Sequence, residues 1–332
     1  MKKSKNIRAL ALFSGGLDSM IAIKLMRLQG IEVTALHMNI GFGSKNDVSE
    51  TLRNRARIVD ADIEIIDIRE KYIQEILFSP KYGYGKHFNP CIDCHGYMFK
   101  IALGLLERFD AQFVVSGEVV GQRPMSQRLD AMRSVKKLSG DEDNLILRPL
   151  SAKNMPYTKP ELEGWVDKEK LWGVSGRGRD MQLSFAKECG WEDFQSPGGG
   201  CLLTDPRFAI KMKEFLKYES LHVEDIDILK TGRHLRLPDG AKLVVGRDEK
   251  ENTILEKTNH PNFLHVKADD IPGPFSLLSK EATQEDKELC ARIVLTFTKT
   301  SKETLYGVQI GDINIKASPL DTREDAHKYF VI

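Results

Sequence analysis

The chain has 332 residues, a formal net charge of +1 and 41% hydrophobic residues. This length suits two globular domains, and the near-neutral charge gives no overall field that would by itself indicate a nucleic-acid or membrane partner. Five cysteines in a chain of this length argue against a disulfide framework. We expect a cytoplasmic protein with no membrane association, because the basic first residues run straight into an apolar strand without a cleavage site.

Strands and helices alternate over the first half of the sequence. Strands are predicted over residues 7–12, 31–39, 63–68, 113–115 and 145–147. Helices are predicted over residues 20–28, 47–60, 70–78, 95–109, 160–167 and 180–189. This alternation is typical of an α/β fold with a doubly wound parallel sheet.

The sequence SGGLDS lies between the first predicted strand and the first predicted helix. Its two glycines let backbone N–H groups turn inward, and the start of a helix offers unpaired N–H donors and partial positive charge. The two serines add hydroxyl groups, so the loop is predicted to bind phosphates. The aspartate in the same loop indicates a cation such as Mg²⁺ between its carboxylate and the phosphates. The residues of this prediction are Ser14, Gly15, Gly16, Asp18 and Ser19.

Polar or small residues also follow two other predicted strands. Ligands of parallel α/β sheets bind at the carboxyl ends of the strands. We therefore expect His37 and Met38, at the end of the second strand, and Gly117, after the fourth, to face the nucleotide region. Arg123 or Arg148 is expected to neutralise charge on the phosphates, with a surface or capping role as the alternative for each arginine.

Three cysteines lie in sequences with functional features, namely Cys91 and Cys94 in NPCIDCH and Cys201 in a triple-glycine loop. The first two are predicted at the start of a helix, where the thiolate is favoured and the thiol pKa is lowered. Structural zinc, a redox pair with persulfide chemistry and an iron–sulfur cluster are all open. Zinc would need a fourth ligand such as His95 or His87. Three thiolates without a fourth cysteine fit a cluster with one open iron best, although spacing alone leaves zinc and cluster comparable.

The pattern changes after the first two hundred residues. We predict a first domain over residues 1–194, a glycine-rich cysteine loop or linker over 195–204 and a smaller α+β accessory domain over 205–332. Strands of the last part are predicted over residues 231–237, 242–246, 263–267, 293–298 and 306–315, and helices over 206–218, 249–257 and 284–291. Basic residues cluster locally here, which fits either an RNA-binding strip or a solvated face.

In combination, SGGLDS, the segment NPCIDCHGYMFKIA and the later Gly-Gly-Cys loop resemble the tRNA-thiolating branch of the PP-loop ATP pyrophosphatases. The pattern is similar to the tRNA 2-thiouridylases, and its Cys-x-x-Cys pair to the [4Fe–4S]-dependent tRNA thiolases. The resemblance implies that ATP adenylates a uridine carbonyl oxygen and that cluster-bound or persulfide sulfur replaces it, releasing AMP and pyrophosphate. It also implies that Cys94, Cys201 and Asp18 are catalytic, and that Cys91, Cys94 and Cys201 hold the cluster.

The segment KLVVGRDEKEN, residues 242–252, is similar to the RNA-binding domain of ribosome quality-control factors. The two resemblances imply tRNA as a partner. They also imply a sulfur donor, which would be a cysteine desulfurase, a sulfur carrier or inorganic sulfide, and a homodimer is compatible with them. The alternative function is a PP-loop amidotransferase or ligase that acts on a small molecule and carries structural Zn²⁺ at Cys91 and Cys94.

Overall fold

The computed structural model describes residues 6–43, 48–194 and 200–332. The chain divides into two compact units, Met1–Thr204 and Asp205–Ile332. Five residues of the expected linker, 195–199, lie outside the described residues. Within the described part of the chain, no helix is long and apolar enough to cross a membrane.

The first unit is built on a sheet of five parallel strands. They are β1 (Arg8–Leu12), β2 (Glu32–Asn39), β3 (Asp62–Asp67), β4 (Phe113–Ser116) and β5 (Ile146–Leu147), in the order β3-β2-β1-β4-β5. Strand β1 pairs with β2 on one side and with β4 on the other. The direction of winding therefore reverses between β1 and β4, and the doubly wound sheet predicted from the sequence is confirmed. Ligands of such sheets bind outside the carboxyl ends of the strands at this reversal.

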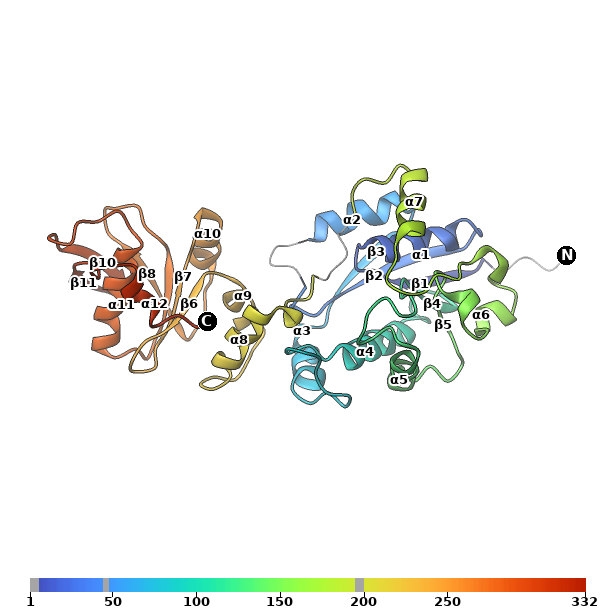
Figure 1. Ribbon diagram of the computed structural model, residues 1–332, viewed down its shortest axis with the longest axis horizontal. Helices are drawn as coiled ribbons and strands as arrows, with labels where there is room; N and C mark the ends of the chain where they lie inside the picture. The colour runs from blue at the N-terminus through green and yellow to red at the C-terminus, as the bar shows by residue number, and fades with distance from the viewer. Residues whose placement is uncertain (1–5, 44–47, 195–199) are drawn as a thin grey trace. The chain divides into compact units, whose positions relative to one another are not determined.

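Helices cover both faces of this sheet, with α1, α2 and α7 on one face and α4 and α5 on the other (Figure 1). The helices of the unit are α1 (Leu17–Arg27), α2 (Ser49–Ile58), α3 (Arg69–Tyr72), the π-helical turn η1 (Ile73–Leu77), α4 (Cys91–Gly104), α5 (Leu129–Ser139), α6 (Lys159–Leu162) and α7 (Asp180–Glu188). Three short 3₁₀ turns are η2 (Ala152–Asn154), η3 (Lys168–Lys170) and η4 (Leu202–Thr204). Helix α1 is apolar on nearly every side because it packs between the sheet and α7.

Three helices of this unit differ from the prediction. The helix predicted over 160–167 ends at Leu162, and Gly164, with a φ of +69°, follows it. Helix α4 begins at Cys91 and ends at Gly104, so the predicted helix over 95–109 was about one turn too late. Pro90 precedes the first turn, where its missing N–H costs no intrahelical hydrogen bond. Helix α5 was not predicted, although its apolar residues Ala131, Met132 and Val135 recur at helical spacing and are buried.

The second unit contains a six-stranded sheet in which every pairing is antiparallel. Its strands are β6 (Arg233–Arg236), β7 (Lys242–Val245), β8 (Phe263–Ala268), β9 (Ser276–Ser279), β10 (Tyr306–Ile310) and β11 (Ile313–Ala317), in the order β11-β10-β8-β9-β7-β6. Its helices are α8 (Pro206–Phe215), α9 (Asp225–Lys230), α10 (Glu249–Lys257), α11 (Gln284–Thr296) and α12 (Glu324–His327). The predicted α+β architecture is confirmed.

One predicted strand of the second unit is wrong. Residues 293–298 were expected to be a strand, but Ile293, Val294 and Leu295 form the end of α11 and are fully buried. The sequence pattern of a short apolar run with β-branched residues does not distinguish a buried helix from a buried strand. Helix α11 packs against β8, β9, β10 and β11, and this contact forms the main core of the unit.

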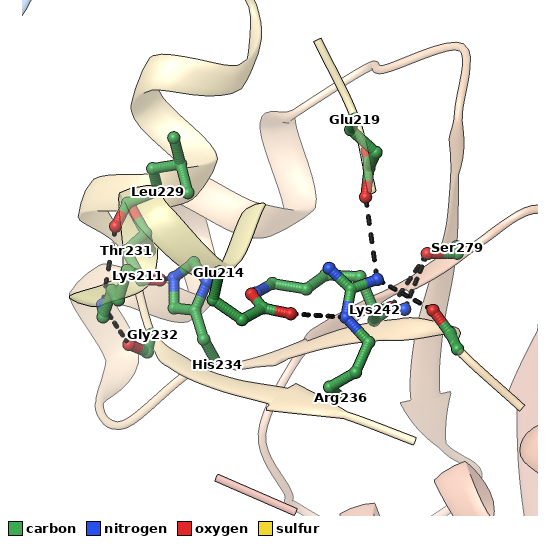
Figure 2. A network of polar contacts seen from close by, with 11 residues as sticks. Lys211, Glu214, Glu219, Leu229, Thr231, Gly232, His234, Arg236, Lys242 and Ser279 are labelled. Carbon is green, nitrogen blue, oxygen red and sulfur yellow. Dashed lines mark hydrogen bonds and ion pairs between the residues drawn. The ribbon is translucent and has the colours of Figure 1, made fainter. Parts of the chain in front are cut away.

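A buried ion network joins α8 to the second sheet. Figure 2 shows Arg236 of β6 and Lys242 of β7 converging on the carboxylate of Glu214 in α8. The Arg236 Nε lies 2.5 Å from Glu214 Oε1, and the Lys242 side chain is only 1% exposed. The guanidinium of Arg236 also lies over the ring of Tyr218, 4.0 Å from its centre. Two cations and one carboxylate thus hold the first helix of this unit on the sheet.

Candidate nucleotide and thiol site

The SGGLDS loop turns directly from β1 into α1. Gly15 has a φ of +74°, a conformation that residues with a side chain rarely adopt, and a β-carbon there would lie 2.7 Å from Leu52 Cδ2. The Gly16 N–H donates to Ser14 Oγ over 3.2 Å, and the Ser19 hydroxyl donates to the Gly16 carbonyl over 2.7 Å. Both predicted serines therefore belong to the loop and hold its shape, and the loop lies at the switch point of the sheet.

Asp18, in the first turn of α1, faces Gln182 of α7 and Arg179, the residue that precedes this helix. Arg179 Nη2 lies 3.9 Å from Asp18 Oδ1, and Gln182 Nε2 donates to the same oxygen over 3.4 Å. The Mg²⁺ ion expected beside this carboxylate stays a prediction, and the nearest cation that the structure describes there is Arg179. Neither Arg179 nor Gln182 was predicted for the site. The available signal was the basic turn over residues 177–179 immediately before a predicted helix.

Arg55 of α2 was also missed. Its Nη1 donates to the carbonyl oxygen of Gly15 over 3.1 Å, and its Nη2 pairs with Asp193 Oδ1 over 2.8 Å. The guanidinium thus ties the glycine turn to the segment that follows α7. A single arginine on a charged helix gives no sequence signal for such a role.

His37, at the end of β2, contacts the residue before the loop. His37 Nδ1 donates to the carbonyl oxygen of Phe13, the residue before the loop, over 2.9 Å. Burial lowers the pKa of His37, and the hydrogen bond to Phe13 opposes that effect only in part. The ring is therefore neutral at pH 7, with its tautomer fixed by the carbonyl. Met38 is buried.

Gly117, after β4, touches the first turn of α1. A β-carbon at this position would lie 2.6 Å from both the carbonyl carbon and the following amide nitrogen at Asp18 and Ser19. Only a glycine lets the two loops approach so closely. The predicted position of Gly117 at the nucleotide edge thus has a packing reason as well as a functional one.

The next residue, Glu118, links this edge to α4. Its carboxylate accepts a hydrogen bond from His95 Nδ1 over 2.7 Å and another from Arg148 Nε over 2.8 Å. Burial would raise the pKa of Glu118, but Arg148 and His95 together lower it to about 2. Arg148, which we expected to neutralise phosphates, is 7% exposed and is engaged by Glu118 instead. Arg123, the other expected cation, lies exposed in the loop after β4.

The three predicted cysteines come together. The thiols of Cys91 and Cys201 lie close enough to the Cys94 thiol, in the first turn of α4, to raise its pKa, and Cys91 raises that of Cys201 in the same way. The backbone around Cys201 is docked by two hydrogen bonds, from Leu202 N to the Phe42 carbonyl over 2.8 Å and from Phe88 N to the Leu203 carbonyl over 3.1 Å. Segments far apart in the sequence therefore supply one group of sulfur atoms.

The expectation of a lowered thiol pKa is wrong for Cys94. Burial and the neighbouring Cys201 thiol raise the pKa of Cys94, which is 8% exposed. Burial also raises the pKa of Cys201 to about 11. The loss of hydration outweighs the field of the helix N-terminus. Both groups are thus neutral thiols at pH 7 unless a cation binds them.

Two polar side chains border the thiols. Asn89 Nδ2 donates to Cys91 Sγ over 3.1 Å. The Tyr72 hydroxyl lies against the Cys94 thiol, and burial together with the nearby sulfur atoms raises the pKa of Tyr72. That hydroxyl has no regular hydrogen bond to the residues the structure describes. The sequence did not indicate Asn89 or Tyr72 as site residues, because Asn89 lies in a predicted loop and Tyr72 in a predicted helix with no functional motif.

The residues were also tested as a metal site. In the stretches 6–43, 48–194 and 200–332, no group of three or more His, Cys, Asp and Glu side chains has the spacing that holds a single metal ion. His95, which was considered as a fourth zinc ligand, forms a hydrogen bond through its Nδ1 with the carboxylate of Glu118. The donor set of three thiols suits a metal–sulfur cluster, which is larger than one ion and takes cysteine ligands.

Two family comparisons match different parts of the chain. Residues 5–158 match the family described as "Thiamine biosynthesis protein (ThiI)". Residues 232–329 match the family described as "NFACT protein RNA binding domain". The first unit therefore contains a ThiI-type PP-loop domain, and the second contains an NFACT-type domain. Both resemblances predicted from the sequence motifs are confirmed.

Individual relatives agree with the first match. A probable tRNA sulfurtransferase of Thermococcus kodakarensis is 31% identical over 182 residues, which cover 54% of this chain and 43% of that protein. A tRNA-specific 2-thiouridylase MnmA of Syntrophotalea carbinolica is 28% identical over 124 residues, 35% of each chain. The chain thus spans less than half the length of these relatives. A solved 4-thiouridine synthetase–RNA complex with bound ATP has a TM-score of 0.43 and 20% identity, covering 67% of this chain and 52% of that one.

Proposed function

We propose that the protein is an ATP-dependent tRNA sulfurtransferase that thiolates a uridine. One observation carries the proposal. Residues 117 and 118 join the two halves of the site, because Gly117 packs on Asp18 of the phosphate-binding loop and Glu118 holds His95, the neighbour of Cys94. A loop for ATP phosphates and a group of thiols are therefore adjacent. The matches to ThiI and to tRNA sulfurtransferases support this reading over an amidotransferase or ligase with structural zinc.

The first step is activation of a uridine carbonyl, whose oxygen is a poor leaving group. The carbonyl oxygen forms a bond to the α-phosphorus of ATP, and the bond from that phosphorus to the bridging oxygen breaks. The N–H groups of the SGGLDS loop and the start of α1 receive the pyrophosphate. Asp18 would hold a Mg²⁺ ion that offsets the phosphate charge. The target base must leave its stack to reach this edge.

Sulfur then replaces the activated oxygen. A carbon–sulfur bond forms at the same carbon, the carbon–oxygen bond breaks, and AMP leaves. Cys94 and Cys201 are the residues that would bring sulfur to this carbon, either as a persulfide on one thiol or from a bound cluster. In the persulfide route the outer sulfur bonds to the carbon, the other thiol attacks the inner sulfur, the S–S bond breaks, and the two cysteines are left as a disulfide that a thiol reductant must reduce. A cysteine desulfurase or a sulfur carrier would supply the persulfide, whereas inorganic sulfide, which is already at the sulfide level, would serve only the cluster route.

We further propose that Cys91, Cys94 and Cys201 hold a [4Fe–4S] cluster. Three cysteine ligands leave one iron of such a cluster without a protein ligand, and that iron supplies a position for sulfur. The raised thiol pKa values of Cys94 and Cys201 fit this arrangement, since a buried thiolate is stable only beside a cation. Asn89 would donate to the sulfur of Cys91, a hydrogen bond of the kind that tunes such clusters.

The second unit is proposed to bind the tRNA substrate. Its match to an RNA-binding family supports this role, and a separate binding module would hold the tRNA while one base enters the site.

The function is tested by mass spectrometry of tRNA nucleosides from a strain that lacks the gene. We expect one thiolated uridine to disappear and to return with the wild-type gene, but not with Asp18→Ala. Unchanged thionucleosides in the deletion strain would exclude the function. The cluster is tested separately by anaerobic purification, which should give a brown protein that absorbs at about 400 nm. Serine at Cys91, Cys94 or Cys201 should remove the bound iron, whereas Cys290→Ser, in the core of the second unit, should not.

A further inference from the structure

Arg179 carries a guanidinium that the protein itself uses only in part. Its side chain is 11% exposed, and its contact with Asp18 is an ion pair of 3.9 Å, which is too long for a hydrogen bond. Its Nε is buried and has no hydrogen-bond partner among the described residues. A buried donor without a partner costs free energy. In native proteins, such a group usually has a ligand or an ordered water molecule as its partner.

Gln182, one turn further along α7, shows the same feature. It is fully buried, its Nε2 donates to Asp18, and its Oε1 has no partner in the described parts of the chain. The side chains of Arg179, just before α7, and of Gln182 within it thus converge on the first turn of α1, and each has a polar atom left without a partner. Their position is fixed, because Phe185 of α7 packs edge-on against both Trp172 and Trp191.

The segment before α7 is also fixed at the nucleotide edge. Ser175 pairs with Val120 in an isolated parallel bridge, and Gly176 N donates to the Val120 carbonyl over 2.7 Å. Val120 follows β4, the strand beside β1 at the switch point. Arg179 therefore stands where the chain leaves that edge, beside the loop that would receive phosphates.

We propose that Arg179 binds the pyrophosphate part of ATP and stabilises it as the leaving group. The inference rests on the proposed function and adds a residue to it. A guanidinium offers planar donors that match phosphate oxygens. Without nucleotide, Arg179 offsets the charge of Asp18 across 3.9 Å. With nucleotide, its donors turn to the phosphates, and negative charge that moves to the pyrophosphate as the α-phosphorus–oxygen bond breaks meets a cation already in position.

The experiment measures ligand binding to the full chain by calorimetry, with ATP, pyrophosphate and AMP as separate probes. For Arg179→Gln we expect the dissociation constants of ATP and pyrophosphate to rise about 10- to 100-fold, while that of AMP changes less than about twofold. Arg179→Lys should give an intermediate loss, because lysine keeps the charge but not the planar fork. Arg177→Gln is the matched control, since Arg177 lies exposed in the same turn, and should bind all three ligands like the wild type.

Each outcome decides between the two proposals. Wild-type ATP and pyrophosphate affinities in folded Arg179→Gln or Arg179→Lys would overturn the role of Arg179 and leave the proposed function intact. Equal loss in the Arg177 and Arg179 variants would also overturn it, because a general basic field would then explain the binding. A wild-type protein that binds neither ATP nor pyrophosphate would overturn both proposals. Thermal unfolding of each variant tests whether it is folded, and Arg179→Lys keeps the test valid if the glutamine variant is not.

Discussion

Gly117 and Asp18 approach so closely that a single methyl group cannot fit between them. A β-carbon on Gly117 would lie 2.6 Å from the carbonyl carbon of Asp18. The backbone of the first turn of α1 thus occupies the space that a side chain at position 117 would need. The shape of the phosphate-binding loop depends on this contact.

Gly117→Ala should therefore weaken ATP binding about tenfold or more and lower the free energy of unfolding by about 1–3 kcal/mol through overpacking. Gly104→Ala is the control, because a β-carbon there would meet no atom within 4 Å. It should leave ATP binding unchanged. Calorimetry with ATP and urea unfolding measure the two effects. A Gly117→Ala protein with wild-type ATP affinity would mean that the loop tolerates the displacement.

Glu118 should make the first unit sensitive to acid. Its folded pKa of about 2 lies below the ordinary value of 4.5, so the ionised carboxylate stabilises the fold above pH 4.5, and this stabilisation is lost as the pH falls from 4.5 towards 2. The difference corresponds to roughly 3 kcal/mol. Glu118→Gln should lose about that amount at pH 7, because it leaves Arg148 buried without its carboxylate.

The measurement is urea unfolding followed by tryptophan fluorescence between pH 7 and pH 3, since all three tryptophans belong to the first unit. Glu118→Gln should show a smaller fall in stability with acid than the wild type does. Glu107→Gln, at an exposed site, should follow the wild-type curve. Parallel curves for wild type and Glu118→Gln would contradict the assignment.

The parts of the candidate site whose place in the fold the sequence predicted are local in the chain. SGGLDS and the Cys-x-x-Cys pair each occupy one turn beside a strand or helix end, so residue types and spacing define them. The doubly wound sheet follows from alternating apolar runs in the same way. Cys201 was found because three glycines precede it, although its meeting with Cys94 depends on docking against Phe42 and Phe88.

The residues that the sequence missed act across long distances in the chain. Arg179 reaches Asp18, and Arg55 reaches Gly15. Neither approach has a local pattern. Arg148 was expected to face phosphates because it follows a predicted strand end. Its guanidinium is instead bound by Glu118, another contact that no local pattern indicates. The thiol pKa was predicted from the helix start alone, whereas burial by distant segments decides it. Packing determines which charges meet, and a single sequence does not contain that information in readable form.

The ion network in the second unit should respond unequally to removal of its members. Glu214→Leu leaves the buried Lys242 without its carboxylate and Arg236 with only Glu219, 3.8 Å away (Figure 2), so we expect a loss of about 3–5 kcal/mol. Lys242→Met leaves Glu214 paired with Arg236 and should cost less than half as much. Hydrogen exchange of β6, β7 and α8 in the full chain measures both. Equal losses would show that Glu214 and Lys242 contribute only as an isolated pair.

A tRNA-binding surface is expected around Arg233 of β6. Burial lowers the pKa of Arg233, and the nearby charges of Arg247 and Arg323 lower it further, which shows that three arginines from separate segments gather there. The Arg233 guanidinium also lies 5.0 Å from the centre of the Phe297 ring. Glu251, which pairs with Arg247, and Asp248 offset part of the repulsion between these like charges, and RNA phosphates would relieve the rest.

Arg323→Glu, at an exposed position, should therefore weaken tRNA binding about tenfold and reduce the slope of log affinity against log salt by roughly one or more. Arg292→Glu, exposed on α11, makes the same change of charge outside the group and should have a smaller effect. Filter binding of tRNA from low to high salt measures both variants. If they lose affinity equally, net charge explains the binding. If only Arg323→Glu loses affinity, the arginine group contacts the phosphate backbone, because a contact at a defined position changes both affinity and the number of ions released.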